Sequence, residues 1–348
     1  MTAAPARRGP PRPLSVAPMM GWTDRHYRRF VRGLTRRTLL YSEMITAAAV
    51  LHGDRERLLG FDAGERPVAL QLAGDDPAAL AEAARVAASW GYDELNLNVG
   101  CPSERVQRGR FGACLMAEPV LVAAAVRAMR AAVDVPVTVK HRLGIDELDS
   151  DEHLHAFVAG LDAAGVDRVV VHARKAWLSG LSPRQNRTVP PLQHERVVAV
   201  KRAYPGLRVE LNGGVRDLET ARGWLDRVDG VMIGRAAIED PFLLAEADTL
   251  VFGAAHPPPS RDDAVAAYVP HLEAQLGAGV PWTVLVKPLI PLVRGVRGGR
   301  AWRRALSEGA TRRGAGPELV LAALAALPEP VRTARGRGVS DGLVDSRA

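Results

Sequence analysis

Polar residues and glycines recur where short aliphatic runs of this sequence end, and their types could do chemistry. Asn212-Gly213-Gly214 and Gly234-Arg235 each close such a run. Glycine leaves backbone N–H groups accessible and arginine can bond two oxygens at once, so the two endings together indicate a site for a phosphate group. Either ending alone is an ordinary turn.

Lys140 and His172 close two further runs. The pattern Val-Thr-Val-Lys puts Lys140 on the same strand face as Thr138. A fixed cation there could stabilise an anionic reduced flavin, or it could form a Schiff base with a carbonyl substrate. His172 could hydrogen-bond a ring or a phosphate, although a single histidine is more often structural. These residue types leave redox and carbonyl chemistry open.

Cys101 is the most sharply placed single residue. It lies between Gly100 and Pro102, directly after the run that ends at Asn98. The second cysteine, Cys114, is expected to be a small buried side chain. Two cysteines thirteen residues apart predict neither a disulfide framework nor a four-cysteine zinc site, and we expect no metal.

Eight short aliphatic runs alternate with helical stretches along most of the chain. The runs are residues 14–18, 39–43, 67–72, 94–98, 135–141, 168–172, 208–212 and 230–233. Helices are predicted between them, at residues 77–90, 119–132, 150–164, 195–204 and 217–226. Five strands could form an open doubly wound sheet, but eight in succession leave no edge when the sheet closes. The pattern therefore predicts an α/β fold, a (β/α)8 TIM barrel, with its chemistry at the carboxyl ends of the strands.

The charge of the chain is unevenly distributed. The net charge is +7, yet residues 13–256 are nearly neutral, and the basic excess falls in residues 1–12 and 257–348. A solvated helix face is the ordinary explanation of the basic residues. A neutral body with a separate basic module is also what a polyanion binder requires.

The carboxyl-terminal part is expected to form a separate unit. A proline-rich stretch at 254–260 ends the alternating pattern, and helical periodicity follows at 262–276, 283–294, 300–308 and 318–327. We expect a catalytic barrel at 13–256, a basic helical domain at 260–328, and disordered tails at 1–12 and 329–348. Since no long apolar run and no signal-peptide core occur, we expect a cytoplasmic protein without membrane contact, and we infer no obligate protein partner.

The chain also contains several long and specific segments. They are VAPMMGWTDRHYR, YSEMITAAAVLHGD, PVALQLAG, ELNLNVGCPSERVQRGRFGACLM, VTVKHRLGID, VVVHARKAWLSGLSPRQNR, ELNGGV and DGVMIGRAAIEDPFLL. These segments resemble the tRNA-dihydrouridine synthases, specifically their A subgroup. The resemblance runs from about Ser15 to Leu244 and implies an FMN-binding (β/α)8 barrel with a carboxyl-terminal helical domain. It also implies NADPH-dependent reduction of the C5=C6 bond of D-loop uridines in tRNA, at positions 20 and 20a.

The resemblance implies roles for individual residues. The positions that match FMN-binding ones are Pro18, Met19, Met20, Gln71, Lys140, His172, Asn212, Gly213, Gly214, Gly234 and Arg235. Cys101 would give a proton to C5 once hydride from FMN has reached C6, and a thiol of ordinary pKa ~8.5 is still protonated at neutral pH. The positions that match tRNA-contacting ones are Asn98, Arg184, Arg187, Arg300 and Arg303. The target base must leave its stack to reach a barrel mouth.

Two places depart from the family pattern. The family's usual aspartate after the APMM motif is Gly21 here, which removes a carboxylate near the expected cofactor. The family's run before its arginine signature is replaced by a segment that contains Lys287, Pro288 and Pro291. Two prolines should break or kink a helix there.

Three other functions fit parts of the pattern. A free-pyrimidine flavoenzyme of the dihydroorotate type would share the barrel and FMN, but it would not need the basic cluster. A Schiff-base aldolase built on Lys140 would need no flavin. A non-catalytic RNA-binding barrel would not need Cys101, Lys140 and His172 together.

Overall fold

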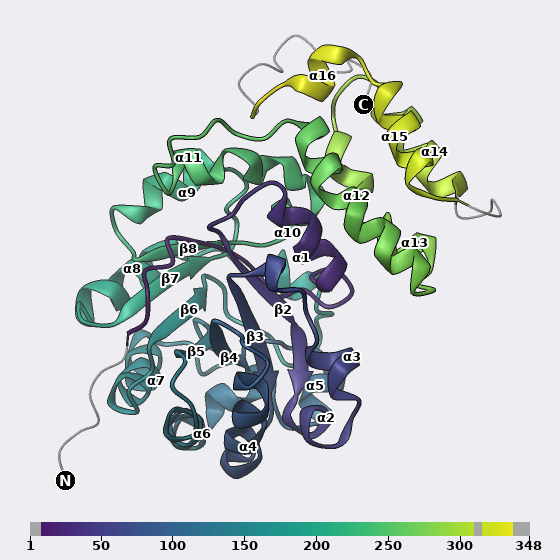
Figure 1. The fold of residues 1–348 in the computed structure, drawn as a ribbon. Helices are drawn as coiled ribbons and strands as arrows, with labels where there is room; N and C mark the ends of the chain where they lie inside the picture. The colour runs from purple at the N-terminus through teal and green to yellow at the C-terminus, as the bar shows by residue number, and fades with distance from the viewer. Residues whose placement is uncertain (1–7, 310–314, 337–348) are drawn as a thin grey trace.

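A computed structural model describes residues 8–309 and 315–336 of the chain. Eight parallel strands form one closed barrel, in which each strand pairs with the next and β8 pairs with β1 (Figure 1). The strands are β1 (Leu14–Val16), β2 (Leu39–Thr46), β3 (Val68–Ala73), β4 (Glu94–Val99), β5 (Val137–Arg142), β6 (Arg168–His172), β7 (Arg208–Asn212) and β8 (Gly230–Ile233). The predicted (β/α)8 barrel is confirmed, and the last three strands have the predicted bounds.

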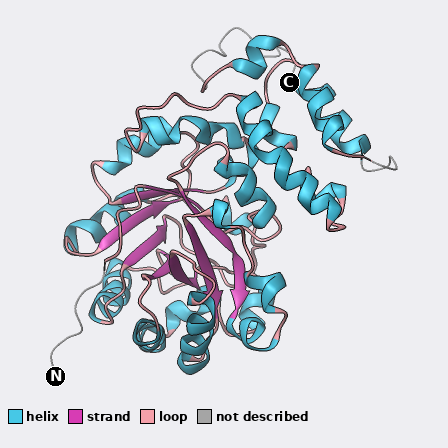
Figure 2. Ribbon diagram, in the orientation of Figure 1, coloured by secondary structure: helices cyan, strands magenta, loops and turns pink. Residues whose placement is uncertain are grey.

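Helices surround the barrel on its outside (Figure 2). They are α1 (Arg25–Arg32), α2 (Ala47–His52), α3 (Arg55–Leu59), α4 (Pro77–Ala88), α5 (Glu104–Arg108), α6 (Pro119–Ala132), α7 (Asp151–Ala163), α8 (His194–Ala203), α9 (Leu218–Leu225), α10 (Arg235–Glu239) and α11 (Ala247–Leu250). Short 3-10 helices lie between them, at η1 (Ala63–Glu65), η2 (Gly112–Ala117), η3 (Gln185–Arg187) and η4 (Pro241–Glu246). Local sequence sets the helix starts: Asp76 accepts a hydrogen bond from the backbone N–H of Ala78, and Pro77 occupies the first turn of α4.

Apolar side chains gather mainly between the barrel and its helices, whereas the inside of the barrel is largely polar. Val137 and Val139 of β5 belong to the large outer cluster. A small separate cluster inside the barrel includes Tyr41, Val170 and Met232. The buried inward-facing polar side chains include Ser15, Gln71, Glu94, Asn96, Asn98, Thr138, Arg142, Arg168, Glu210 and Asn212. Buried polar groups need hydrogen-bond partners, so the barrel interior is built as a polar network.

The helical part that follows the barrel comprises α12 (Arg261–Gly277), α13 (Trp282–Leu285), α14 (Gly299–Gly309), α15 (Pro317–Ala325) and α16 (Glu329–Thr333). Helix α12 packs against α1 of the barrel, where the rings of Phe30 and Tyr268 meet edge to face at 5.6 Å between centroids. The helix predicted at 283–294 is not continuous, and only a 3-10 turn, η5 (Ile290–Val293), follows α13. The reason is that Pro288 and Pro291 lack the N–H that a helix requires.

The described ends of the chain are attached to the rest of the molecule. Arg8, within the segment expected to be a tail, forms a 3.0 Å ion pair with Asp162. Residues 329–333, also expected in a tail, form α16, and Arg261 donates a hydrogen bond to the carbonyl of Val331. The rest of the expected tails, residues 1–7 and 337–348, lies outside the described residues.

Within the described part of the chain, no helix is both long and apolar enough to cross a membrane. In the same residues, no group of three or more histidine, cysteine, aspartate or glutamate side chains is placed to hold a metal ion. A cleft at the amino ends of the strands is lined by Arg12, Arg36 and Phe252. It therefore lies at the opposite end of the barrel from the polar strand ends.

Candidate active site at the carboxyl end of the barrel

Four neighbouring strands bring polar side chains to the carboxyl end of the barrel. In the strand register, Asn98 of β4 is level with Lys140 of β5, Arg142 with His172 of β6, and His172 with Asn212 of β7. Alternate residues of β5 point inward, so Thr138, Lys140 and Arg142 share the interior face. The structure thus brings these strand ends together in one mouth, as the sequence predicted.

Lys140 is a cation whose ammonium meets no partner among the described residues. Within the residues described, no hydrogen bond or ion pair reaches its ammonium group. Burial and, to a smaller extent, the nearby Arg142 lower the pKa of Lys140 to about 8, although Glu210 and Cys101 act in the opposite direction. Lys140 is half-buried at the mouth, so a ligand there can reach its ammonium and supply the partner that the protein does not.

A buried charge network lies one layer below Lys140. Arg168 donates to both carboxylate oxygens of Glu94 at 2.7 Å, and its Nε lies 2.9 Å from Oε2 of Glu210. Thr138 and Tyr41 also donate to Glu94, at 2.6 and 2.9 Å. Burial raises the pKa of Glu210, and Arg168 opposes that shift. One guanidinium serves two carboxylates, so this layer complements the positive charge of Lys140 above it.

A chain of amide side chains supports the loop of Cys101. Gln71 donates to Oδ1 of Asn96, and Asn98 donates to Oε1 of Gln71, both at 2.8 Å. Oδ1 of Asn98 accepts hydrogen bonds from the backbone N–H groups of Gly100 and Cys101, at 3.1 and 3.0 Å. Asn98 is buried and its side chain is engaged within the protein. Its visible role is to hold Cys101.

The thiol of Cys101 is half-buried at the mouth. Its Sγ lies 3.6 Å from Oγ of Ser103, and its carbonyl accepts a hydrogen bond from the N–H of Ala113. Gly112 has a φ of +78°, and a Cβ at this position would lie 2.6 Å from the carbonyl oxygen of Cys101. Only glycine lets the segment of η2 come this close to the cysteine loop. Cys114 is also half-buried, and burial raises its pKa.

Glycines end β7 and β8: Gly213 is buried, whereas Gly214 is exposed and Gly234 is half-buried. Gly213 and Gly214 have φ values of +111° and +78°. A Cβ on Gly213 would lie 2.7 Å from Cδ2 of His172, so the histidine ring rests against that glycine. Gly234 is open, since a Cβ there would meet only the Cβ of Ala17, at 3.9 Å. Glycine and a following arginine, Arg235, therefore leave room for an anion beside the backbone.

His172 lies in a positive environment. Burial lowers its pKa well below the ordinary value, and Arg142, Lys140, Arg174 and Arg235 lower it further. The imidazole is therefore neutral at pH 7, with one nitrogen to donate and one to accept.

The loop after β6 adds two of the sequence-predicted arginines to the mouth. Nη2 of Arg235 donates to the carbonyl of Arg187 at 3.2 Å. Burial and then Arg235 lower the pKa of Arg187, while the nearby Cys101 raises it. Arg184 lies exposed on the same loop. The structure thus brings Arg187, Arg235 and Cys101 into one neighbourhood.

Arg300 and Arg303 lie elsewhere. Both are exposed on α14, which packs against α15 and η5 and not against the barrel strands (Figure 1). The structure does not bring them to the mouth.

The loop after β1 closes another side of the mouth. Pro18 and Met19 are half-buried and Met20 is 61% exposed. Below the loop, Glu43 bonds to the backbone amides of Gly21 and Trp22, which lower its pKa, but burial and Asp24 raise it overall. Oε1 of Glu43 is buried without a hydrogen-bond partner in the part of the chain described.

Sequence reasoning missed Arg142 and the network of Glu94, Arg168 and Glu210. Arg142 lies two residues after Lys140, and the period of a strand puts both side chains on the same face. Glu94 and Glu210 lie in runs predicted as buried strands, where a carboxylate is unusual. Those signals could have found them.

The chain matches the family model described as dihydrouridine synthase (Dus) over residues 15–327. It is 54% identical to the tRNA-dihydrouridine(20/20a) synthase of Synechocystis sp., over 91% of this chain and 95% of that protein. The proteins of the same name from Shewanella oneidensis and Xanthomonas campestris are 51% and 53% identical, over 89% and 88% of this chain and 92% and 91% of their own lengths. A solved structure of a 2-naphthoyl-CoA reductase complex is similar in fold, with a TM-score of 0.52 and 12% identity over 67% of this chain and 49% of that one. This chain belongs to the dihydrouridine synthase family.

Proposed function

We propose that this protein reduces the C5=C6 bond of uridine in tRNA to dihydrouridine, with a flavin as cofactor and a nicotinamide nucleotide as reductant. The observation that carries the proposal is a half-buried thiol, Cys101, at the same barrel mouth as the unpartnered ammonium of Lys140. The names of the relatives, at more than half identity and about nine-tenths coverage, support the same reaction.

We propose FMN as the flavin. The open backbone at Gly234, with the exposed Arg235 beside it, fits a phosphate end, and the unpartnered Lys140 fits the electron-rich end of the ring system. The half-buried Pro18 and Met19, with Met20 beside them, offer an apolar edge. When bound, the reduced flavin would supply the hydride for C6 of the uracil, with NADPH as the source of its electrons.

Lys140 would hold the negative charge of the reduced cofactor. An ammonium of pKa about 8 is still mostly protonated at pH 7. The neutral His172 could either donate or accept a hydrogen bond at the edge of the flavin ring. A charged imidazole could only donate one. Gln71 is buried in the amide chain and would fix the floor of the pocket.

Cys101 would supply the proton that C5 needs after hydride has arrived at C6. Asn98 and Gly112 set the backbone on which the thiol stands. The cations near Cys101 would draw an electron-rich, anionic ligand to the mouth. A thiol in this position can give its proton and recover one from solvent.

The tRNA would enter over the loop that carries Arg184 and Arg187, with the target base flipped toward the mouth. Asn98 matches a tRNA-contacting position of the family, but its side-chain bonds favour support of the Cys101 loop. Arg300 and Arg303 would hold the tRNA backbone at a distance from the reacting base.

The D-loop uridines at positions 20 and 20a are our proposed targets, because the relatives' printed names carry those positions. The contact with tRNA also leads us to propose a cytoplasmic protein.

The experiment uses the purified protein, loaded with FMN, an unmodified tRNA transcript and NADPH. We expect dihydrouridine at positions 20 and 20a, detected by mass spectrometry of nuclease fragments, and loss of NADPH absorbance that depends on tRNA. Free uracil and orotate serve as alternative substrates in parallel. Turnover of a free pyrimidine without turnover of tRNA would contradict the proposal, and so would a purified protein that binds no flavin.

A further inference from the structure

Trp22 is a large aromatic side chain that the proposed chemistry leaves unused. It lies on the loop after β1 and is 44% exposed, and its neighbour Met20 is 61% exposed. Single exposed apolar residues are common and need no explanation. Two of them on either side of Gly21, beside a mouth lined with cations, are less ordinary. The contacts that hold this loop therefore bear on its function.

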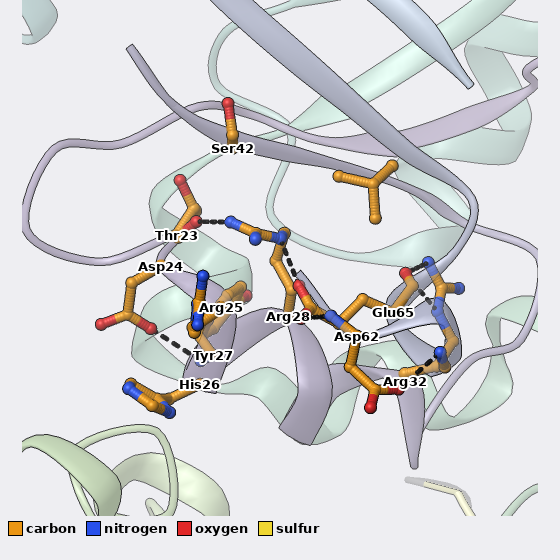
Figure 3. A network of polar contacts seen from close by, with 12 residues as sticks. Thr23, Asp24, Arg25, His26, Tyr27, Arg28, Arg32, Ser42, Asp62 and Glu65 are labelled. Atoms are coloured by element: carbon orange, nitrogen blue, oxygen red, sulfur yellow. Dashed lines mark hydrogen bonds and ion pairs between the residues drawn. The ribbon is translucent and has the colours of Figure 1, made fainter. Parts of the chain in front are cut away.

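The loop is fixed from the barrel side (Figure 3). The N–H of Met19 donates to Oγ1 of Thr23 at 3.0 Å, and Nη1 of Arg28 donates to the carbonyl of Thr23 at 2.8 Å. Arg28 is itself held by a 2.8 Å ion pair with Glu65, and both side chains are buried. Asp24 caps α1 through the N–H of Tyr27. These bonds fix the backbone on both sides of the indole.

The loop is also fixed from the side of the helical part. Lys287, between α13 and η5, donates a hydrogen bond from Nζ to the carbonyl of Gly21. The same ammonium lies over the Trp22 ring, 4.4 Å from its centroid. Gly21 has a φ of +75°, and a Cβ there would meet no atom within 4 Å, so the loop surface is open to solvent at this point. The two places where the sequence departs from the family pattern are thus in contact with each other.

We propose that Trp22 is a stacking site for a nucleobase of the bound tRNA that neighbours the flipped uridine. This inference rests on the proposed function. Single-stranded RNA loops are recognised by stacking of their bases on aromatic side chains and by cations on their phosphates. Trp22 offers the ring face opposite the ammonium of Lys287, and Lys287 offers the cation. The hydrogen bonds around them fix the geometry before tRNA arrives, which reduces the entropic cost of binding.

The test compares tRNA affinity in FMN-loaded wild type, Trp22→Ala, Trp22→Phe and the control Leu250→Ala. Leu250 is 37% exposed at the end of α11, next to residues that line the cleft at the amino ends of the strands. Fluorescence anisotropy with labelled, unmodified tRNA is recorded from 50 to 300 mM salt. Reduction of the bound flavin by NADPH without tRNA is recorded for each variant, because it shows whether the cofactor site is intact.

Trp22→Ala is expected to weaken tRNA binding between about five-fold and about a hundred-fold at every salt concentration, with an unchanged salt slope. Trp22→Phe should recover most of the affinity, and Leu250→Ala should match the wild type. Flavin reduction without tRNA should be equal in all four proteins.

Two results would overturn the stacking site. One is unchanged tRNA affinity in Trp22→Ala while the wild type still forms dihydrouridine, which leaves the proposed function standing. The other is unchanged affinity with a loss of self-association by sedimentation, which would assign Trp22 to a protein interface. If Trp22→Ala unfolds, Trp22→Phe tests the stacking site instead. A loss of tRNA affinity in Trp22→Phe as large as the loss expected for Trp22→Ala would contradict simple stacking. A wild type that forms no dihydrouridine would instead contradict the proposed function.

Discussion

Nε of Arg142 donates a 2.9 Å hydrogen bond to the carbonyl oxygen of Gly100, the residue before Cys101. Nη1 of the same guanidinium donates to the carbonyls of Lys175 and Asn186, at 3.1 and 2.9 Å. One buried side chain of β5 therefore joins the loop that carries the thiol to the loop after β6. This arrangement makes Arg142 a positioning residue for both sides of the proposed tRNA entry.

Replacement of Arg142 by lysine is expected to loosen both loops. Lysine keeps a charge but cannot bond to three carbonyls with one rigid planar group. We expect the free energy of unfolding to fall by about 2–4 kcal/mol and dihydrouridine formation to fall at least about ten-fold. Alkylation of Cys101 by iodoacetamide should become faster as its loop opens. Arg127→Lys, at an exposed site on α6, is the control; equal alkylation rates in the two variants would remove the positioning role.

Replacement of Lys140 by methionine is expected to stabilise the flavin-free protein at pH 7 while it abolishes flavin binding. Burial lowers the pKa of Lys140 to about 8, so folding opposes its charge. Between about pH 8 and pH 10.4 the unfolded chain binds this proton and the folded chain does not, so the contribution of Lys140 to the free energy of unfolding rises with pH.

Urea unfolding of the flavin-free wild type and Lys140→Met at pH 7, 8, 9 and 10 measures this difference directly. The stability gap in favour of methionine should narrow above pH 8, because the neutral amine no longer carries a charge whose desolvation opposes folding. A gap that is constant across the series, or a variant that is less stable at pH 7, would contradict the assignment of Lys140 as a desolvated cation without a partner among the described residues.

Replacement of Arg168 by methionine is expected to be strongly destabilising. It leaves Glu94 and Glu210 buried without the guanidinium that bonds both. Removal of one partner from such a buried network costs about 3–5 kcal/mol. Addition of Glu94→Gln and Glu210→Gln to the variant should recover much of the loss, because no charge then remains uncompensated. Chemical denaturation of the single and triple variants distinguishes uncompensated charge from a simple packing defect. If packing were the cause, the two extra substitutions would lower the stability further.

Replacement of Arg303 by alanine is expected to weaken tRNA binding without an effect on the flavin. Arg303 is exposed on α14 and remote from the mouth. A phosphate contact should lower the slope of log K against log salt by about one, and Arg127→Ala should not. Titrations of tRNA at four salt concentrations test this. An unchanged slope would show that Arg303 of α14 makes no contact with a tRNA phosphate.

The strand order of the barrel followed from the sequence because buried parallel strands form short aliphatic runs that few other segments match. Helix α1 was not predicted, although it is well formed. Its sequence is dominated by arginines, and its buried face includes Arg28 and Arg32. The guanidinium of Arg32 donates to the carbonyls of Thr35, Thr38 and Glu65. These hydrogen bonds compensate the burial of its charge, and hydrophobic periodicity cannot reveal them.

The sequence predicted those site residues that lie at the carboxyl ends of barrel strands, where such barrels carry their chemistry. Lys140, His172 and the glycines after β7 and β8 lie at those strand ends, as predicted. The pairing of Arg168 with Glu94 and Glu210 depends on three strands that are far apart in sequence, so no local pattern reveals it. Asn98 illustrates a further limit, because its position in the motif does not show that its side chain bonds to Gln71 and to the Cys101 loop.

The most direct measurement is a single turnover of the FMN-loaded protein, reduced beforehand by NADPH, with unmodified tRNA. Flavin oxidation and dihydrouridine at position 20 are followed together in the wild type, Cys101→Ala and the control Cys114→Ala. We expect the wild type and Cys114→Ala to form dihydrouridine, and Cys101→Ala to bind flavin and tRNA normally but to form it at least about a hundred-fold more slowly. Dihydrouridine formed by Cys101→Ala at the wild-type rate would contradict the account.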